Sequence, residues 1–370
     1  MIRKCQVAII GGGPAGLAAA IECGKAGADT LIIDENARPG GQLFKQIHKF
    51  FGSREHYAGV RGFDIGEQLL DQVRQAGVEI WLESTVSGIF CGNRIPVVRK
   101  ESERQMIHTV EAEKILIATG GQENAVQFEG WTLPGVMGAG CAQTMANVNL
   151  VRPGERILMI GSGNVGLMVS YQLLQAGAKI QGIVEMAGQI GGYGVHAAKL
   201  RRAGIPFYLN HTILRAEAGP DGTTARAVIG RVGDQGTCIP GTELEFDVDT
   251  VCVAAGLRPI TKLAKMCGAE LMFVPELGGW MPRHDSHMQT TVPGIYVAGD
   301  LAGVEEASTA MEEGRLAGVN MAHALGLLCD EEAVKQNGVI GKRLEALRLG
   351  PFGERRLKAK RRIEEGRCQQ

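Results

Sequence analysis

The most constraining feature of this chain is a glycine-rich motif that occurs twice, 150 residues apart. Residues 7–35 and residues 157–185 align without a gap, and ten of the 29 positions are identical, among them Glu35 and Glu185. Each copy places a short apolar stretch before GxGxxG, a longer apolar stretch after it, and an acid at the end of a second short apolar stretch. This order predicts a strand, a tight turn, a helix and a second strand, which is how a dinucleotide-binding fold begins.

The three glycines of each motif have separate physical roles. The first makes the turn, the second lets the backbone approach a pyrophosphate, and the third lets the helix pack closely against the strand. One copy alone is a weak signal because a glycine turn can be purely architectural, whereas two copies in the same context indicate two nucleotide sites. The glycines are Gly11, Gly13 and Gly16 in the first copy, and Gly161, Gly163 and Gly166 in the second.

The residues that open the two expected helices differ between the copies. The first copy has Pro14 and Ala15, and the second has Asn164 and Val165. The N–H groups at a helix start have no partner within the helix and carry a partial positive charge. We therefore expect both helix starts to face the phosphates of a nucleotide.

An acid closes each copy: Asp34 or Glu35 in the first, and Glu185 in the second. A carboxylate at this position accepts hydrogen bonds from ribose hydroxyls, whereas an NADP site commonly has an arginine for the 2′-phosphate. No Lys or Arg lies between Lys179 and Lys199, and Glu185 would repel a phosphate. We expect the second copy to prefer NAD, although its changed helix start leaves ATP or no ligand as alternatives.

A secretory signal peptide is an alternative interpretation of the positively charged, apolar N-terminal stretch. Residues 11–14, with the sequence GGGP, interrupt that stretch at its centre. In a helix interior each glycine would cost roughly 1 kcal/mol and the proline about 3 kcal/mol. We therefore predict a strand from Val7 to Ile10 and a helix from about Pro14 to Ala26, and no signal peptide.

Composition limits the class of protein. With 370 residues, 45% of them hydrophobic, the chain suits two or three soluble domains. A formal net charge of -1 gives no electrostatic reason to bind nucleic acid, and no stretch resembles a membrane span. Its 53 glycines are about twice the ordinary share, which indicates many tight turns or close backbone approaches.

The nine cysteines are widely spaced, and no two lie closer than 14 residues in the sequence. This spacing contains no CxxC, no zinc-type pair and no iron-sulfur run, so we expect no metal site. Because no signal peptide is expected and the count is odd, we predict reduced thiols in a cytoplasmic protein. Most of them should be small buried hydrophobes, and Cys141 is the one that we consider for a nicotinamide edge or a partner.

A second internal match supports the duplication. The segments KILIATGGQ, residues 114–122, and TVCVAAGLRP, residues 250–259, are both buried-strand patterns that run into a turn of small residues. The turns contain Thr119 and Gly120 in one case and Gly256 in the other. Each segment follows its own GxGxxG and would close its own nucleotide domain, so one domain is inserted into the other.

The segment TTVPGIYVAGDLAG, residues 290–303, makes a family resemblance specific. It is expected to form a strand from Ile295 to Ala298, then a turn with Gly299 and Asp300, followed by a long helix. Here the chain resembles the two-dinucleotide-binding flavoproteins, which include thioredoxin reductase and glutathione reductase. The resemblance covers about residues 5–325. It implies an α/β fold of two Rossmann-like domains, the second inserted into the first as in glutathione reductase.

The resemblance implies a place for FAD and for each part of its site. GGPAG with Asp34 or Glu35 corresponds to the ADP site, and Asp300 to the aspartate that binds the ribityl chain. The start of the long helix would face the flavin pyrimidine ring and stabilise the negative charge of the reduced flavin. The other matching residues are Gly41, Gln42 and Leu43 in the loop under the flavin, Thr119 and Gly120 beside the pyrophosphate, and Ala307, Ser308 and Thr309 at the helix start.

The implied domain order is an FAD domain in two parts, residues 1–125 and 261–330, around an inserted NAD-type domain, residues 126–260. Residues 331–370 would form a basic C-terminal tail. Seven basic residues between Arg355 and Arg367 indicate a solvated helix, with docking to an acidic partner as the alternative.

The chain departs from the disulfide reductases because it lacks their paired cysteines. GGQLFKQIHKFF, LPGVMGAGCAQTM and GGYGVHAAKLRRAGIPF resemble a narrower family, the alpha subunits of heteromeric amino-acid dehydrogenases and oxidases. These include proline and hydroxyproline dehydrogenases, opine oxidases, the cyanide-forming glycine oxidase and part of sarcosine oxidase. The likeness implies a hetero-oligomer in which a second flavoprotein, the beta subunit, oxidises the amine. Many such relatives continue into a cysteine-rich iron-sulfur segment, whereas this tail has only Cys368, so a cluster would belong to another polypeptide, such as a small iron-sulfur protein.

The sequence names no catalytic residue, because hydride transfer by a flavin needs no side-chain acid. For His48, His56, His196 and His211 we expect surface or packing roles, with His48 of some interest because it follows the flavin loop. Two other functions remain open. One is a self-sufficient NADH-dependent reductase of a small redox protein, and the other is a non-catalytic subunit that binds ADP or ATP.

Overall fold

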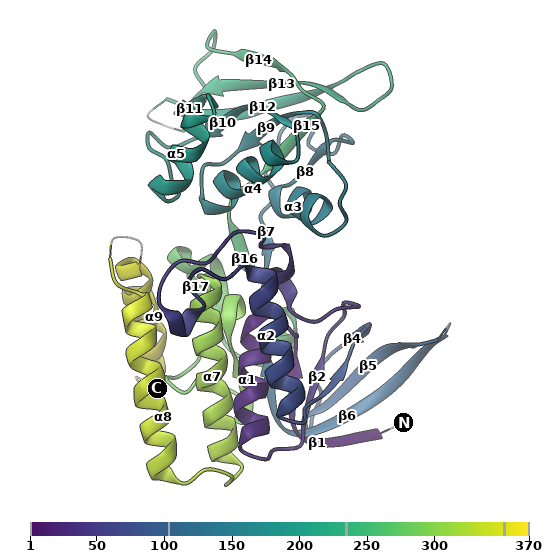
Figure 1. Ribbon diagram of the computed structural model, residues 1–370, viewed down its shortest axis with the longest axis vertical. Coiled ribbons are helices and arrows are strands. Elements are labelled where there is room, and N and C mark those ends of the chain that lie inside the picture. Colours follow the sequence, from purple (N-terminus) through teal and green to yellow (C-terminus); the bar gives the residue numbers. More distant parts are fainter. Residues whose placement is uncertain (1, 103, 234–235, 351–352, 369–370) are drawn as a thin grey trace. The chain divides into compact units, whose positions relative to one another are not determined.

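The structure is a computed structural model that describes residues 2–102, 104–233, 236–350 and 353–368. It forms two compact units (Figure 1). The first combines residues 1–122 with residues 258–370 and is called the split unit, and residues 123–257 are the inserted unit. The expected α/β fold, with one unit inserted into the other, is confirmed.

The split unit contains a seven-stranded sheet in the order β3-β2-β1-β6-β5-β4, with β19 also paired to β6. Three register pairs, Ile10 with Ile33, Ile10 with Ile117, and Val297 with Ile117, bring the carboxyl ends of four parallel strands to one edge. The strands are β1 (Ile2–Ile10), β2 (Thr30–Ile33), β3 (Glu79–Trp81), β4 (Ser84–Val86), β5 (Arg94–Glu101), β6 (Arg104–Ile117) and β19 (Ile295–Val297). The turns that follow these four strands therefore lie close together at the same edge of the sheet.

Helices α2 (Gly62–Gln75), α1 (Pro14–Lys25) and α7 (Ala307–Ala324) lie side by side in this order (Figure 1). The predicted first strand, first helix and long C-terminal helix are confirmed. Where α1 and α7 cross, a Cβ on Gly314 would lie 2.1 Å from the carbonyl oxygen of Ala15, so the two backbones touch. The unit also has α6 (Lys262–Met266), β17 (Leu271–Val274), β18 (Gly279–Pro282) and the 3-10 turns η1 (Gly41–Lys45), η2 (Arg54–His56), η3 (Pro275–Leu277) and η4 (Gly299–Ala302).

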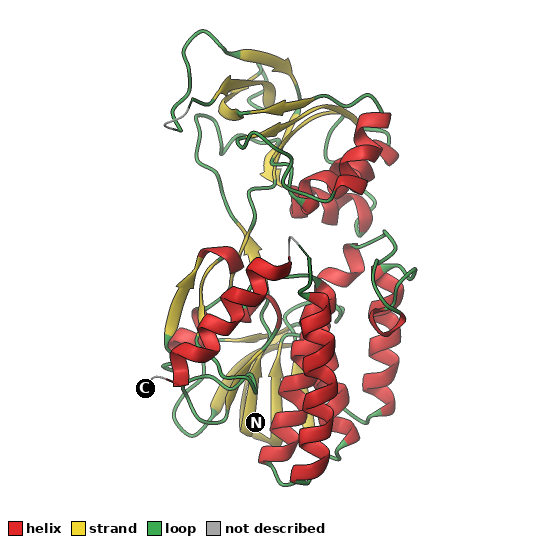
Figure 2. Cartoon of the chain, turned by 90° about the vertical axis from the view of Figure 1, so that its left-hand side faces the viewer, coloured by secondary structure: helices red, strands yellow, loops and turns green. Residues whose placement is uncertain are grey.

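The inserted unit repeats this plan with a parallel sheet in the order β11-β10-β9-β15-β8. Its helices lie to one side of the strands (Figure 2), and the three-stranded sheet β12-β13-β14 packs on the other face through a second apolar cluster. The elements are β8 (Val136–Gly138), α3 (Ala139–Asn147), β9 (Arg156–Ile160), α4 (Asn164–Gln175), β10 (Lys179–Glu185), α5 (Gly194–Arg202), β11 (Phe207–Leu209), β12 (His211–Ala218), β13 (Thr224–Arg231), β14 (Leu244–Asp247) and β15 (Thr250–Val253). The two connections between the units, β7 (Gly121–Glu123) and β16 (Leu257–Pro259), pair with each other.

Two helices follow α7: α8 (Asp330–Leu347) and α9 (Gly353–Cys368). The expectation of a solvated C-terminal helix is wrong at one face of α9. Ala359 and Ile363 are buried against the β17–β18 hairpin, and the side chain of Lys360 is only 2% exposed. The sequence did not predict this apolar face, because the helix has many more basic residues than buried apolar ones. The side chain of Cys368 lies outside the described residues.

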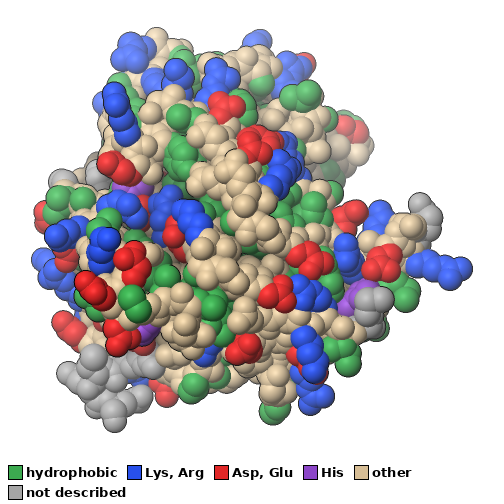
Figure 3. Space-filling view, turned by 60° about the horizontal axis from the view of Figure 1, so that its bottom comes forward, with side chains coloured by type: hydrophobic (Ala, Val, Ile, Leu, Met, Phe, Trp, Pro, Cys, Tyr) green, Lys and Arg blue, Asp and Glu red, His purple; other side chains and the backbone are tan. Residues whose placement is uncertain are grey.

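On the face shown in Figure 3, basic and acidic side chains are interspersed rather than gathered by sign. Across the described ranges, no helix is both long and apolar enough to cross a membrane.

Candidate dinucleotide-binding sites

The first glycine turn joins three strand ends of the split unit. Gly11 has a φ of 107°, and a Cβ there would lie 2.4 Å from the carbonyl oxygen of Ala118. Its N–H donates to the oxygen of Ile33, and the N–H of Ala118 donates to the oxygen of Ile10, at 2.9 and 2.8 Å. Only glycine fits this position, because both the conformation and the contact exclude a side chain.

The second and third glycines differ in what surrounds them. A Cβ on Gly16 would lie 1.9 Å from the oxygen of Gly11, so α1 packs directly on the turn. Gly13, the N-cap of α1, has no atom within 4 Å of a built Cβ, and no side chain caps the helix. The first turn of α1 thus has an open space beside N–H groups without helical partners, which fits a pyrophosphate.

The two acids after β2 have different environments. Asp34 is buried, and its Oδ2 accepts the N–H of Gly12 at 2.6 Å while its Oδ1 accepts the N–H of Asn36 at 2.8 Å. Glu35 is exposed. Asp34 therefore holds the glycine turn in place through its hydrogen bond with Gly12, in addition to any contact with a ribose.

The loop after β2 returns to the same glycine turn. The N–H of Gly40 donates to the oxygen of Gly12 at 2.6 Å, and a Cβ on Gly41 would lie 3.0 Å from the Cα of Gly13. Leu43 anchors this loop in the core, whereas Gln42 is exposed. The sequence-predicted flavin loop thus lies against the start of α1.

The turn after β6 lies at the same edge of the sheet. Thr119 Oγ1 donates to the carbonyl oxygen of Ile260 at 3.2 Å, and the carbonyl oxygen of Gly120 accepts the N–H of Ile260 at 3.0 Å.

The turn after β19 meets α1 as well. Gly299 has a φ of 70°, and a Cβ there would lie 3.0 Å from the Cβ of Ala15. Ser308 and Thr309 are buried in the first turn of α7, where the Thr309 hydroxyl donates to the oxygen of Glu306 at 2.6 Å.

Asp300 has a raised pKa. Burial raises the pKa of its carboxyl to about 6, and the carboxylates of Glu313, Glu306 and Glu305 add to the effect. A carboxyl group whose pKa lies near neutral pH can accept a hydrogen bond when ionised and donate one when protonated. Either form suits contact with a sugar-alcohol hydroxyl.

This shift predicts a pH dependence for the FAD-free protein. Because the folded pKa lies above the unfolded one, the neutral form of Asp300 contributes stability below about pH 4 that is lost as the pH rises to about 6. Asp300→Asn should therefore raise the free energy of unfolding by on the order of 2–3 kcal/mol above about pH 7, and by much less near pH 4. Urea unfolding of both proteins across this range measures the difference, and a difference that does not change with pH would contradict the expected titration.

The glycine turn of the inserted unit has the same geometry. A Cβ on Gly161 would lie 2.3 Å from the oxygen of Ala254, and one on Gly166 would lie 2.2 Å from the oxygen of Gly161. Gly163 again has no atom within 4 Å of a built Cβ. The second turn is therefore also open where a pyrophosphate would lie.

The gapless alignment of the two copies is wrong beyond residue 180. Strand β10 has a register shift between Ile180 and Gly182, so Ile160 pairs with Val184, whereas Ile10 pairs with Ile33. The offset becomes 151 after this irregularity.

The counterpart of Glu185 is consequently Asp34 rather than Glu35. Glu185 Oε2 accepts the N–H of Ser162 at 3.0 Å, and its Oε1 accepts the N–H of Ala187 at 2.9 Å. Asp34 makes the same two kinds of backbone contact, to the second residue of its turn and to the residue two positions further on.

A glycine pair also returns to the second turn. The N–H of Gly192 donates to the oxygen of Ser162 at 2.8 Å, as Gly40 does in the first site, and Tyr193 donates its N–H to Asn164 Oδ1 at 2.8 Å. Val165 packs partly against the helical core, and Gly256, with a φ of 85°, accepts the N–H of Asn124 at 3.0 Å. Asn164 thus orders the loop over its own site, a role that the sequence did not predict.

The residues that the sequence analysis missed are ionic and buried. Adjacent Glu312 and Glu313, in the middle of α7, are 0% and 2% exposed. Glu312 accepts from His56 at 3.1 Å and from Arg343 at 2.9 Å, and also pairs with Arg315. Two adjacent acids in a helix whose other residues are mostly small or apolar are the signal that would have revealed them.

Four other candidate residues lie in different environments. His56 and His196 are buried, His48 stacks on Phe50 at 5.7 Å, and Cys141 is exposed on α3. The eight cysteines with described side chains are all free. Within the described ranges, no cluster of three or more His, Cys, Asp or Glu residues could hold a metal ion.

The family follows from this arrangement of two glycine turns at two parallel-sheet edges. Residues 5–314 match the family model described as pyridine nucleotide-disulphide oxidoreductase. The chain belongs to this family. It is an FAD-dependent oxidoreductase of a family that binds FAD and NAD(P).

Three similar proteins are named as subunits of enzymes. The chain is 31% identical to the A component of opine oxidase from Agrobacterium tumefaciens, covering 88% of this chain and 66% of that one. It is 30% identical to the HcnB component of hydrogen cyanide synthase from Pseudomonas aeruginosa, covering 92% and 75%. Against the alpha component of sarcosine oxidase from Corynebacterium sp. (strain P-1) the identity is 24%, over 87% of this chain and 33% of that one. The chain thus spans about two thirds to three quarters of the first two relatives and a third of the last.

Two solved structures share the fold. T. acidophilum thioredoxin reductase has a TM-score of 0.70 at 19% identity, over 87% of this chain and 99% of that one. L-proline dehydrogenase from P. horikoshii has a TM-score of 0.68 at 23% identity, over 92% of this chain and 60% of that one.

Proposed function

We propose that this chain is the electron-transferring FAD subunit of a heteromeric dehydrogenase that acts on an amino acid or a related secondary amine of the proline, hydroxyproline, opine or sarcosine type. A second flavoprotein subunit would oxidise the amine. The observation that carries the proposal is the open first turn of α1 at Gly13, surrounded by the loops after β2, β6 and β19, in a chain related to subunits of such enzymes.

The split unit would hold FAD. The open space at Gly13 and the N-terminus of α1 would take the pyrophosphate, Asp34 or Glu35 the ribose, and Asp300 the ribityl chain. When bound, FAD would supply two-electron redox chemistry, with a nicotinamide, a second flavin or an iron-sulfur centre as the other electron carrier. The protein groups would bind and orient FAD and exclude water from it. The pocket for the amine would lie in the partner subunit.

The inserted unit would hold NAD through Gly161, Gly163 and Gly166, with Glu185 near the ribose. Glu185 already accepts two hydrogen bonds from Ser162, and a carboxylate there disfavours the 2′-phosphate of NADP. The free cysteines agree with a cytoplasmic compartment.

Purification of the tagged chain from its native cell tests the proposal. We expect the purified complex to contain a second flavoprotein and to reduce an artificial acceptor when an amine of the proline or sarcosine type is added. The chain alone should contain FAD but fail to respond to the amine. Amine oxidation by the isolated chain, or a complex that no such amine reduces, would contradict the proposal.

A self-sufficient NADH-dependent reductase is a second candidate, favoured by the open turn at Gly163. Anaerobic mixing of the isolated chain with NADH tests it, because this function requires turnover with an artificial acceptor as well as rapid flavin bleaching, whereas a live NADH site alone accounts for bleaching. A third function, a non-catalytic subunit that binds ADP or ATP, is tested by releasing the bound nucleotides with acid and identifying them by chromatography. Well-folded protein without flavin would exclude both enzymatic functions for this chain alone.

A further inference from the structure

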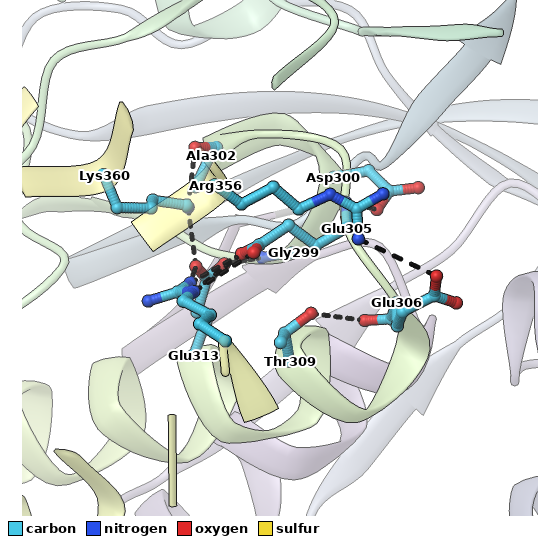
Figure 4. A network of polar contacts seen from close by, with 10 residues as sticks. Gly299, Asp300, Ala302, Glu305, Glu306, Thr309, Glu313, Arg356 and Lys360 are labelled. Carbon is cyan, nitrogen blue, oxygen red and sulfur yellow. Dashed lines mark hydrogen bonds and ion pairs between the residues drawn. The ribbon is translucent and has the colours of Figure 1, made fainter. Parts of the chain in front are cut away.

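Two cations of the C-terminal helices reach the same buried carboxylate of α7. Lys360 Nζ on α9 and Arg348 Nη2, at the end of α8, each lie 2.6 Å from Glu313 Oε1. The side chains of Lys360, Arg348 and Glu313 are 2%, 8% and 3% exposed, respectively. Figure 4 shows Lys360 and Glu313 directed toward one another beside the turn that contains Gly299.

This carboxylate and Lys360 hold the two ends of η4. Glu313 Oε2 accepts the N–H of Gly299 at 3.1 Å. Lys360 Nζ donates a second hydrogen bond to the carbonyl oxygen of Ala302 at 2.8 Å. The turn that carries Asp300 is therefore fixed at its first and last residues by one ion pair.

Arg348 holds the segment that follows. Its Nη2 lies 2.6 Å from Glu305 Oε2, and the N–H of Glu305 donates to Asp300 Oδ1 at 3.5 Å. Burial disfavours the charged guanidinium, but the carboxylates of Glu313 and Glu305 outweigh it and raise the pKa of Arg348. Arg348 therefore remains a cation in this buried place.

The cluster of Glu305, Glu313, Arg348 and Lys360 contains two carboxylates and two cations, so its charges balance when all four are ionised. Removal of Lys360 leaves Arg348 alone to compensate two buried carboxylates, Glu313 and Glu305, so Glu313 loses part of its compensation. That carboxylate would take up a proton or turn away from its partners, and the backbone contact to Gly299 would weaken.

Docking of α9 does not require the ion pair. Ala359 and Ile363 of α9 are fully buried against Val274, Leu277 and Met281, which form an apolar cluster of their own. Burial of Lys360 between Ala359 and Ile363 carries an unfavourable desolvation free energy, because its charge must leave water. Its contacts to Glu313 and Ala302 account for its position better.

We propose that Lys360 and Arg348 are positioning residues for FAD, acting through Glu313 and the backbone of η4 on Asp300. This inference rests on the FAD site proposed above. It assigns to the C-terminal helices a part in binding the flavin, although they lie beyond the residues that match the family model.

A double-mutant cycle on FAD affinity tests the inference. FAD-free full-length chain is titrated with FAD, and the dissociation constant is read from flavin fluorescence. We expect Lys360→Met and Asp300→Ala each to weaken FAD binding about 10-fold or more. The combined variant should lose clearly less than the product of the two factors, because Lys360 acts through the turn that carries Asp300. Lys358→Met, on the exposed face of the same helix, is the matched control and should bind FAD normally.

The outcomes separate the possibilities. A purely structural role would lower the stability of Lys360→Met but leave FAD affinity unchanged or strictly multiplicative with Asp300→Ala, and either result overturns the inference. If Lys360→Met does not fold, the variant Lys360→Met/Glu313→Gln removes one charge of each sign. It should fold and bind FAD weakly, and normal affinity would overturn the inference. Lack of FAD binding by the unchanged chain would overturn the proposed function as well.

Discussion

We expect Gly13→Val to lose FAD while remaining folded, and Gly163→Val to retain FAD while losing its response to NADH. Gly13 has φ and ψ of -75° and -175°, and Gly163 has -66° and 173°, both extended conformations that valine adopts readily. Apart from the neighbouring residues of the chain, no atom lies within 4 Å of a Cβ at either position, so a side chain can begin there without a clash at Cβ. Valine would fill the space proposed for the pyrophosphate, and we expect FAD affinity to fall by about 100-fold.

Each variant serves as the control for the other. Bound nucleotide is measured by acid release and chromatography, NADH response by anaerobic flavin bleaching, and folding by circular dichroism and thermal unfolding. Full FAD content in Gly13→Val would show that the first turn does not carry the pyrophosphate. An unchanged NADH response in Gly163→Val would remove the inserted unit from the proposed nicotinamide site.

The second large effect concerns stability. Gly314→Ala should lower the free energy of unfolding by about 3 kcal/mol, because the new methyl group would lie 2.1 Å from the backbone oxygen of Ala15. Neither backbone can yield without moving α1, which carries the first glycine turn. FAD affinity should fall with stability, and denaturant unfolding measures the loss.

Gly338→Ala on α8 is the matched control. Gly338 is an exposed helical glycine with no atom within 4 Å of a built Cβ. Alanine there should stabilise the protein by up to about 1 kcal/mol, because it restricts the unfolded chain and favours the helix. Equal effects at Gly314 and Gly338 would show that helix propensity, and not the close crossing of α1 and α7, governs this helix pair.

Local patterns in the sequence predicted the units that repeat. A glycine turn requires particular residues at fixed spacing, so GxGxxG identified both helix starts and the strands before them. The separate segment of residues 290–303 predicted the turn after β19 and the start of α7 correctly. Neither pattern could detect the register shift in β10, because an extra residue within an apolar strand leaves the hydrophobic pattern unchanged. The identity of Glu35 and Glu185 was therefore misleading, and Asp34 is the structural counterpart.

The sequence by itself determined the two glycine turns, the insertion of one unit into the other and the lack of a local dithiol, since each depends on residues near one another in the chain or on their count. Only the tertiary structure decided that Glu312 and Glu313 are buried, and that Lys360 lies under the turn of Asp300. Glu313 and Lys360 are 47 residues apart, and a charged residue is compatible with burial only when its partner arrives from elsewhere in the fold. No local pattern in the sequence identifies that partner. The basic C-terminal run therefore predicted a solvated helix, whereas in the fold Lys360 forms a buried ion pair with Glu313.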